Sequence, residues 1–538
     1  MARRTPRAHY DAIIVGAGFG GLHMLHRLRG LGLTVRLFDA ADQVGGTWFW
    51  NRYPGARCDF ESHDYSYEFD DQLQQDWTWS ERYPAQPEIL RYLNHVADRF
   101  DLRTDIQLRT KVTSAQYADD TESWTVGTEG DDHTETASAQ FLIMATGALS
   151  LPRLPDFPGI DRFAGRWYHT ANWPHESVDF TGKKVAVIGT GSSGVQVIPR
   201  IAQQSEYLYV LQRTAGFIVP AHNRPLSLDE DDAIKSDYQA YRDRARESYL
   251  GVHFPTEDVS ALEATPDERT AAYEARWQAG GSAILATYPD LPTDVRANDT
   301  LADFVRSKIA ELVVDDDTAK LLTPQGFPIG SKRLVVDTEY YPTFNRDTVE
   351  LIDVRADPIE EITETGIRTS NTEYNVDAIV FATGFDALTG PLLNIDIRGT
   401  NGRTLTDKWS AGPTTYLGLA IAGFPNLFSI AGPGSPSVLS NVVRSTEQHV
   451  EWIAELLQHM REHGYRAIAA TPDAEQRWVD DVNDVAAATV LTSANSWYLG
   501  ANVPGKPRVF MPYAGGVPEY RRICDDIAAD NYRGFVLS

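Results

Sequence analysis

Apolar residues along the chain gather into short runs separated by helical stretches, and one such arrangement occurs twice. Each copy has a strand, a glycine-rich turn, a helix and a second strand, and the helices reach about residues 30 and 203. The strands are expected over residues 11–15, 34–38, 184–188 and 207–211. This order is typical of a βαβ unit. We therefore predict an α/β protein with two Rossmann-like dinucleotide-binding domains.

Two further buried-looking strands end in the same tripeptide, as if the chain twice crosses a domain boundary. They lie in "FLIMATGALS" (141–150) and "IVFATGFDALTG" (379–390). Between about 225 and 325 the sequence becomes charged and helix-forming, and an amphipathic helix is expected over about 445–463. The pattern predicts a second domain inserted into the first, with a helical insertion of its own.

The charge balance narrows the class of partner. The 538 residues include 49 Lys and Arg against 75 Asp and Glu, so the net charge is −26. Such a surface repels nucleic acid and anionic membranes, and we expect neither as a partner. An anionic cofactor must then be held by local positive groups. No protein partner is evident from the sequence.

The remaining composition favours a cytoplasmic enzyme. Only Cys58 and Cys524 occur, which excludes a disulfide scaffold and fits a reducing compartment. The paired arginines of "MARRTPRAHY" could indicate an export segment, but no separate apolar region follows them. The sequence contains no run of about 18 apolar residues, so we expect no membrane-spanning helix.

The first glycine turn, "VGAGFGG", has the spacing of a dinucleotide-binding loop at Gly16, Gly18 and Gly21. The glycines allow a tight turn, close approach of a pyrophosphate and packing of helix on strand, and the helix N-terminus attracts the anion. Asp39 ends the next strand, where a carboxylate can bond ribose hydroxyls. The position near the N-terminus favours FAD.

The second turn, "IGTGSSG", repeats the spacing at Gly189, Gly191 and Gly194. Its following strand ends in Gln212, Arg213 and Thr214 instead of an acid. Arg213 can form a fork on a 2′-phosphate, so we predict NADPH over NADH. The alternative is a solvated arginine at a strand end.

With these cofactors the predicted domains can be given bounds. They are 1–150 for the first part of the FAD domain, 151–224 for the first part of the NADP domain, 225–325 for the helical insertion, 326–380 for the return of the NADP domain and 381–538 for the second part of the FAD domain.

A chain that binds a flavin and a reduced nicotinamide is an oxidoreductase, and the acceptor of the electrons remains to be identified. A disulfide reductase needs a close cysteine pair, whereas Cys58 and Cys524 lie far apart without a shared motif. A quinone or dye reductase needs no special residue, and an oxygen-using monooxygenase does.

The stretch "FAGRWYHTANWP" between the two domains decides among these classes. It resembles the signature of type I Baeyer–Villiger monooxygenases and has the expected residue at every fixed position of that signature. These residues are Phe163, Gly165, His169, Trp173 and Pro174. In the general character of its sequence, the chain most resembles the phenylacetone and steroid monooxygenases of that family. The resemblance implies that His169 sets the relative position of the domains and is no catalytic base. A zinc ligand is the alternative, but only His175 lies nearby, and we expect no metal.

The resemblance also assigns cofactor contacts. For FAD it adds Thr47, Trp48, Phe49, Trp50, Asp59, Tyr65 and Val442 to the first glycine loop. For NADP the expected residues are Arg57, Cys58, Gly189, Thr190, Gly191, Ser192, Ser193, Gly194, Arg213, Thr214, Lys332, Arg333 and Trp497. From the sequence alone the aromatic residues would be core, and Cys58 is expected to be a packed small residue.

The implied reaction is the NADPH- and O₂-dependent insertion of one oxygen beside a ketone carbonyl, which gives an ester or lactone through a C4a-peroxyflavin. Arg333 would face the flavin as the catalytic arginine, oriented by Asp59, and Lys332 would bind the NADP phosphate. Ser437, Val438, Leu439 and Ser440 resemble the family's substrate loop. Sulfoxidation is expected as a side activity. The alternatives are a monooxygenase of amines or sulfides and a non-catalytic flavoprotein.

Overall fold

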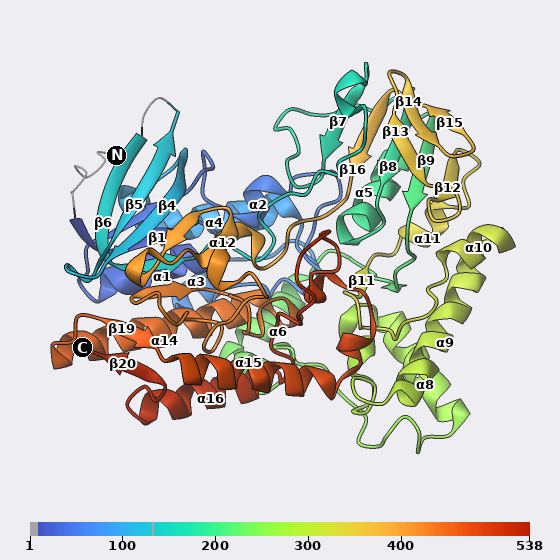
Figure 1. Ribbon diagram of the computed structural model, residues 1–538. Helices are drawn as coiled ribbons and strands as arrows, with labels where there is room; N and C mark the ends of the chain where they lie inside the picture. The colour runs from blue at the N-terminus through green and yellow to red at the C-terminus, as the bar shows by residue number, and fades with distance from the viewer. Residues whose placement is uncertain (1–8, 132–133) are drawn as a thin grey trace.

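In the computed structural model, residues 9–131 and 134–538 are described, and they form two units built on separate sheets (Figure 1). The paired arginines of the N-terminus, on which an export reading rests, lie outside these residues. None of the helices in the described ranges is both long and apolar enough to cross a membrane.

The first unit is built on an eight-stranded sheet in the order β17-β4-β5-β6-β1-β2-β3, with β18 beside β6. Strand β1 runs parallel to β2 and β6, whereas β4, β5 and β6 are antiparallel. The bounds are β1 His9–Val15, β2 Val35–Phe38, β3 Ile106–Gln107, β4 Thr110–Ala118, β5 Ser123–Gly130, β6 Thr134–Met144, β17 Asp396–Arg398 and β18 Leu427–Ser429.

The second unit has a five-stranded parallel sheet in the order β12-β9-β8-β16-β7. A small antiparallel sheet, β13-β14-β15, lies beside it in Figure 1. The bounds are β7 Arg166–His169, β8 Lys184–Ile188, β9 Tyr207–Gln212, β12 Val349–Asp353, β13 Ile359–Ile362, β14 Gly366–Thr369, β15 Glu373–Asn375 and β16 Ala378–Phe381. Two strand pairs stand apart, β10 Ile218–Val219 with β11 Val335–Val336, and β19 Ile468–Ala470 with β20 Phe535–Leu537.

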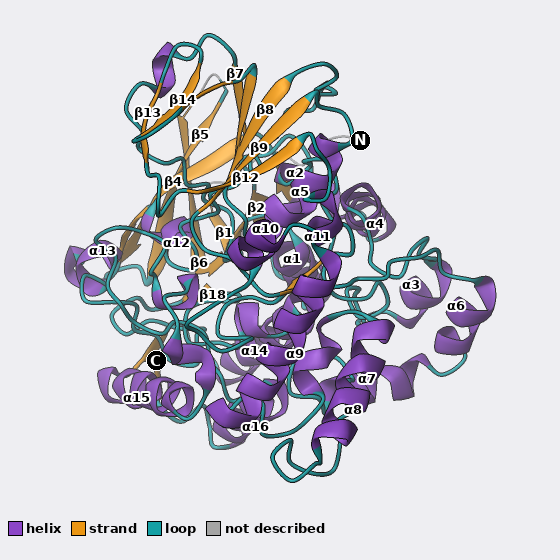
Figure 2. Cartoon of the chain, turned by 90° about the vertical axis from the view of Figure 1, so that its right-hand side faces the viewer, coloured by secondary structure: helices purple, strands orange, loops and turns teal. Residues whose placement is uncertain are grey.

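Helices cover the sheets, and Figure 2 shows most of them gathered on one side of the strands. Those of the first unit are α1 Phe19–Gly30, α2 Thr47–Trp50, α3 Asp71–Asp76, α4 Gln86–Arg99, α12 Gly390–Leu393, α13 Leu405–Lys408, α14 Val442–His463, α15 Pro472–Ala487 and α16 Val517–Ala529. The others are α5 Ser192–Ala202, α6 Leu228–Lys235, α7 Tyr238–Arg246, α8 Pro266–Ala279, α9 Val295–Leu312, α10 Asp316–Leu322 and α11 Tyr340–Thr343. Short 3₁₀ turns are η1 Leu102–Asp105, η2 Ile160–Arg162, η3 Ser282–Ala286, η4 Thr400–Gly402, η5 Ser437–Leu439, η6 Val490–Ser493 and η7 Trp497–Leu499.

Successive side chains of β1 point into two different cores, which explains why the central strands are continuous apolar runs in the sequence. Ala12 and Ile14 face a core shared with α1, α4 and α14, whereas Ile13 and Val15 face a second core beneath β4, β5 and β6. A strand covered on both faces needs apolar residues at every position. The predicted α/β class with two Rossmann-like units is confirmed.

The helical insertion divides its packing between the two units. Tyr273, Trp277 and Leu301, on α8 and α9, belong to the core of the second unit. By contrast α7 is tied to the first unit through Arg242, which is 1% exposed. Its guanidinium donates to the carbonyls of His63 and Tyr67 and to side-chain oxygens of Ser66 and Gln74 at 2.6–3.2 Å. The domain bounds expected from the sequence remain a proposal.

We predict that R242M lowers the stability of the protein by about 3 kcal/mol, because it leaves several buried acceptors without their charged donor. The midpoint of thermal unfolding should fall, and trypsin should cut faster within residues 225–260. The matched control is R244M, an exposed position on the same helix. Equal midpoints for the two variants would contradict the prediction.

Candidate active site

The first glycine loop joins β1 to α1 and depends on the absence of side chains at two positions. Gly16 has φ +109°, and a Cβ on Gly21 would lie 1.8 Å from the carbonyl oxygen of Gly16. Asp39, at the end of β2, accepts hydrogen bonds from the backbone N–H groups of Ala17 (2.6 Å) and Ala41 (2.8 Å). Burial raises the pKa of Asp39. The carboxylate thus stands at the loop, as the sequence predicts.

The aromatic residues expected beside this loop are mostly packed in the core. Trp48 donates from its indole nitrogen to the hydroxyl of Tyr65 at 3.1 Å, and the ring of Tyr65 meets Phe19 of the loop edge-on. Phe49 is buried, whereas Thr47 is exposed. The reading of these aromatics as core and the reading as cofactor contacts are compatible, because the core lies directly under the loop.

The second loop joins β8 to α5 and faces open space. A Cβ on Gly194 would clash with the carbonyl oxygen of Gly189 at 2.2 Å, so helix and strand pack closely there. A Cβ on Gly191 would meet no atom within 4 Å. The loop therefore has room in front of the N-terminus of α5, where backbone N–H groups can bind an anion.

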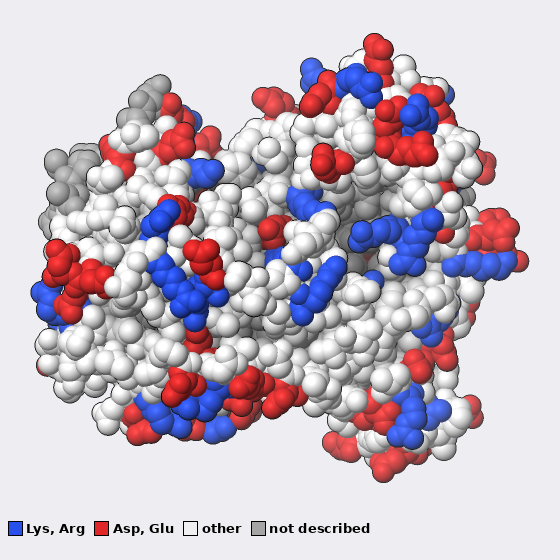
Figure 3. Space-filling model, viewed as in Figure 1, with Lys and Arg blue, Asp and Glu red and all other residues white. Residues whose placement is uncertain are grey.

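Positive side chains lie together beyond the end of β9. Arg355, which follows β12, donates to the hydroxyl of Thr214 at 2.8 Å. Burial, and then the charges of Arg355 and Arg213, lower the pKa of Lys332. None of these three cations forms an ion pair with a carboxylate of the described residues. Figure 3 shows basic side chains around a hollow on one face of the molecule. The sequence analysis missed Arg355, although it follows the strand next to β9.

Arg333 lies between the two units and is bound by a carboxylate. Its Nε and Nη2 atoms donate to both oxygens of Asp59 at 2.7–3.0 Å, and Nη1 donates to the carbonyl of Val438 at 3.1 Å. The side chains of Arg333 and Asp59 are 27% and 23% exposed. Burial by itself lowers the pKa of Arg333, but Asp59 and then Tyr498 raise it above its usual range. The guanidinium is therefore a permanent cation on a partly exposed surface.

The loop predicted to line the substrate site is the one that contacts Arg333. Ser437 adopts φ +41° and donates to the carbonyl of Ala431, and the hydroxyls of Ser440 and Ser445 lie 2.7 Å apart. Val438 and Leu439 pack with Trp497 and Tyr498. Val442 begins α14 directly after the loop. Tyr498 was missed from the sequence, where it reads only as a neighbour of Trp497.

Of two neighbouring residues expected to contact NADP, one is paired with a carboxylate of the protein and the other is buried. Arg57 donates to the carboxylate of Glu81 at 2.8 Å and to the carbonyl of Tyr83 at 3.0 Å. Cys58 is buried, and burial raises the pKa of its thiol well above the usual value. A protonated, buried thiol fits the expectation of a packed small residue.

His169 joins the two places where the chain passes between the units. Its Nε2 lies 3.2 Å from the carbonyl of Arg153 and 3.3 Å from the hydroxyl of Thr383, and its Nδ1 accepts from the N–H of Ala171. Nδ1 therefore carries the lone pair and Nε2 the proton. Burial lowers the pKa of His169, which keeps the ring neutral.

The other signature residues pack around this histidine's strand. A Cβ on Gly165 would lie 2.5 Å from the carbonyl oxygen of Asp377, so only glycine fits there. Phe163 packs against the core on one face of the second sheet. The ring of Trp173 lies tilted against that of Tyr168, with their centroids 5.3 Å apart, and Pro174 follows Trp173 in the chain. In the described part of the chain no group of three metal-ligating side chains occurs.

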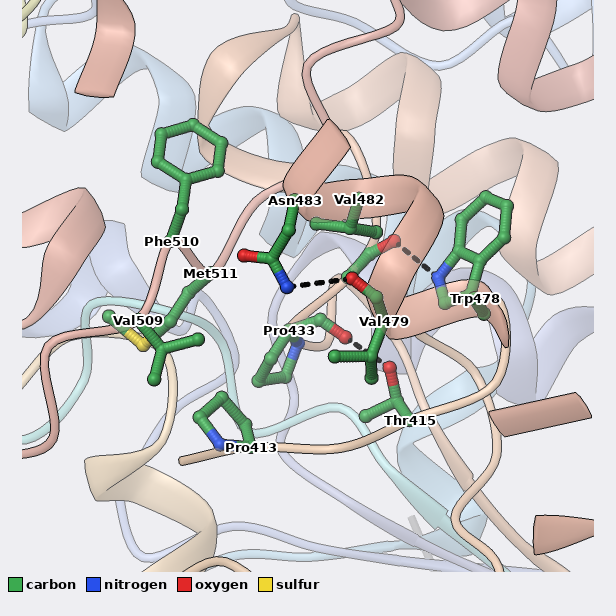
Figure 4. A pocket seen from close by; sticks show the side chains of 11 residues that line it. Pro413, Thr415, Pro433, Trp478, Val479, Val482, Asn483, Val509, Phe510 and Met511 are labelled. Atoms are coloured by element: carbon green, nitrogen blue, oxygen red, sulfur yellow. Dashed lines mark hydrogen bonds between the residues drawn. The ribbon is translucent and has the colours of Figure 1, made fainter. Parts of the chain in front are cut away.

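A small pocket near the substrate loop is a separate feature (Figure 4). It lies between α15 and residues 509–511, and Trp478 closes one side by donating to the carbonyl of Gly434 at 3.0 Å. Its volume of about 10 Å³ suits one water molecule, so it cannot hold a ketone.

Comparison with known proteins gives consistent results. Residues 10–224 match the family model described as flavin-binding monooxygenase-like. The chain is 42% identical to an acetone monooxygenase (methyl acetate-forming) from Gordonia sp. (strain TY-5), over 98% of this chain and 99% of the relative. It is also 42% identical to a Baeyer–Villiger monooxygenase from Pseudooceanicola batsensis, over 99% and 97%.

Solved structures extend the match to three dimensions. A steroid monooxygenase bound to NADP is 51% identical and superposes with a TM-score of 0.94, over 98% of this chain and 99% of that one. Because such identities extend over nearly the whole of both chains, the resemblance is confirmed, and the chain belongs to the Baeyer–Villiger monooxygenases.

Proposed function

We propose that the protein is an FAD-dependent monooxygenase that uses NADPH and O₂ to convert a ketone into an ester or lactone, with release of NADP⁺ and water. The observation that carries the proposal is the hydrogen-bonded pair of Arg333 and Asp59. Arg333 of this pair also donates to the carbonyl of Val438 in the predicted substrate loop. Membership in a family of ketone monooxygenases and two glycine loops support it.

The residues present fit the two cofactors. At the first loop, a Cβ on Gly18 would meet only Gly46, at 3.5 Å or more, and Asp39 stands where ribose hydroxyls of FAD are bound in such folds. At the second, Gly191 faces open space, and Arg213, Lys332 and Arg355 supply the positive charge that a 2′-phosphate requires. When bound, FAD reduced by NADPH supplies the activation of dioxygen.

Arg333 then acts by electrostatics. Negative charge develops on the ketone's carbonyl oxygen when its carbonyl carbon is attacked. A fixed cation beside that oxygen lowers the barrier without a proton transfer. Asp59 holds the guanidinium in one pose by accepting hydrogen bonds from Nε and Nη2 on both of its oxygens. The pair is pre-organised before substrate binds, so no free energy is spent on orienting it during the reaction.

The neighbouring residues bind and orient. Lys332, Arg213 and Thr214 would hold the phosphate end of NADP, and Trp497 would contact the bound nicotinamide cofactor. Val438 and Leu439 give the ketone an apolar wall. His169 stays neutral and keeps the two units in register, so its role is structural. A cytoplasmic location and action on small molecules without a protein partner are part of the proposal.

The direct test is to identify products from purified protein, NADPH and air with phenylacetone, cyclohexanone, progesterone and thioanisole. An ester or lactone one oxygen heavier than its ketone supports the proposal and begins to define the substrate pocket. Sulfoxide without any ester would instead favour the alternative, a flavin monooxygenase that oxidises amines or sulfides.

We expect NADPH to reduce the flavin of R333A at the wild-type rate. Ester formation should be about 10²–10³-fold slower than in the wild type, since an electrostatic donor is lost. Flavin absorbance under anaerobic conditions measures the reduction, and product mass measures the ester. R346A, an exposed arginine of the same segment, is the matched control. Ester formation by R333A at the control's rate would remove this residue from the mechanism.

R213A should lower the preference for NADPH over NADH by about 10–100-fold, the effect of losing charge-assisted hydrogen bonds worth about 1.5–3 kcal/mol. The measurement is the ratio of kcat/KM for the two nucleotides. The control R403A removes one exposed positive charge from the first unit. An unchanged ratio would mean that Arg213 is merely a solvated arginine.

A further inference from the structure

Gln196, on α5, reaches from the second unit into the backbone of the first. Its side-chain amide donates to the carbonyl of Arg57 at 3.1 Å, and its Oε1 accepts from the hydroxyl of Tyr53 at 2.8 Å. The same oxygen lies 3.4 Å from the backbone nitrogen of Arg57. The residue is 5% exposed. A buried amide whose donor and acceptor both have partners holds them in one geometry.

The backbone between these contacts approaches α5 closely. Gly55 has φ +87°, and a Cβ on it would lie 2.5 Å from the carbonyl oxygen of Gln196 and 3.0 Å from the side chain of Arg200. Any larger residue would push the segment away from the helix. The contact between residues 53–57 and α5 is therefore direct, and Gln196 fixes its register.

The same segment is held from its other end by the catalytic pair. Asp59, two residues beyond Arg57, binds Arg333, which follows α10 and precedes β11 in the second unit. Residues 53–59 therefore span from the helix of the nucleotide loop to the guanidinium.

We propose that Gln196 is a positioning residue, which sets the distance between the loop at Gly189–Gly194 and the pair of Asp59 and Arg333. This inference rests on the proposed function. If the register is lost, Asp59 and Arg333 move relative to the bound nucleotide, and reduction by NADPH continues while oxygen transfer to the ketone fails. The two electrons taken from NADPH, together with two protons, then reduce O₂ to hydrogen peroxide.

The experiment compares Q196M with Q203M in the FAD-loaded enzyme. Methionine keeps the length of the side chain and removes its hydrogen bonds, and Gln203 is an exposed glutamine just past the end of the same helix. We expect Q196M to raise the share of NADPH electrons recovered as peroxide several-fold, with an unchanged rate of flavin reduction. Q203M should match the wild type in both measurements.

A second measurement is independent of catalysis. In the absence of substrate, the backbone amides of residues 52–60 should exchange hydrogen about fivefold faster in Q196M, as expected for loss of about one net hydrogen bond. Exchange and peroxide share equal to those of Q203M would overturn the proposal. If wild-type enzyme forms no ester from any ketone, the proposed function fails, and hydrogen exchange alone decides the role of Gln196.

Y53F guards against a folding defect in Q196M. It removes one hydroxyl and leaves the bonds between Gln196 and Arg57, so we expect smaller changes in the same direction. Wild-type values of exchange and peroxide share in both Y53F and a correctly folded Q196M would overturn the assignment. An increase in both variants without a comparable fall in the melting temperature supports it.

Discussion

The guanidinium of Arg333 must remain charged while most of it is removed from water, and the rest of the site depends on how this is achieved. Desolvation alone would make the charge costly, but the carboxylate of Asp59 accepts three hydrogen bonds from the guanidinium and offsets that cost. Because the two residues come from different units, the pair forms only when the two sheets are correctly placed. A local electrostatic requirement is thereby turned into a constraint on the whole architecture.

The same principle operates elsewhere in the molecule with different chemistry. At the crossing between the units, His169 is kept neutral, so hydrogen bonds to Arg153 and Thr383 suffice without a counter-ion. Between α7 and the first unit, Arg242 keeps its charge and is surrounded by carbonyl and side-chain oxygens. These three contacts are polar and directional, so each specifies one arrangement where apolar packing alone would allow several.

Much of the fold could be predicted from the sequence because its strongest patterns are local. The strand at 184–188, the glycine spacing from Gly189 to Gly194 and the helix ending at His463 follow from periodicity and turn chemistry within short windows. The split packing of the insertion could not be predicted, since nothing near Arg242 indicates that its acceptors lie around residues 63–74. Gln196 was missed for the same reason, because a glutamine on an amphipathic helix reads as surface.

Within the site, prediction was most successful where the family resemblance, and not a local sequence pattern, identified the residues. The pairing of Arg333 with Asp59 appears in the structure as the resemblance implied, whereas Arg57 is bound to Glu81, a partner that no sequence pattern links to it. The contacts to cofactors remain proposals. Residues whose partners are distant in sequence, such as Arg355 with Thr214, become visible only once adjacent strand ends are brought together.

The order of the strands has a consequence for synthesis of the chain. The second sheet is complete once Phe381 has been made, whereas the first still lacks β18 and the long helix α14 that packs on α1. The earlier-made half of the first unit must therefore wait through the translation of almost 300 further residues, with its apolar face uncovered. The strands of the second sheet are thus all available before those of the first, and the core that the N-terminal segment shares with α14 can be completed only after α14 has been made.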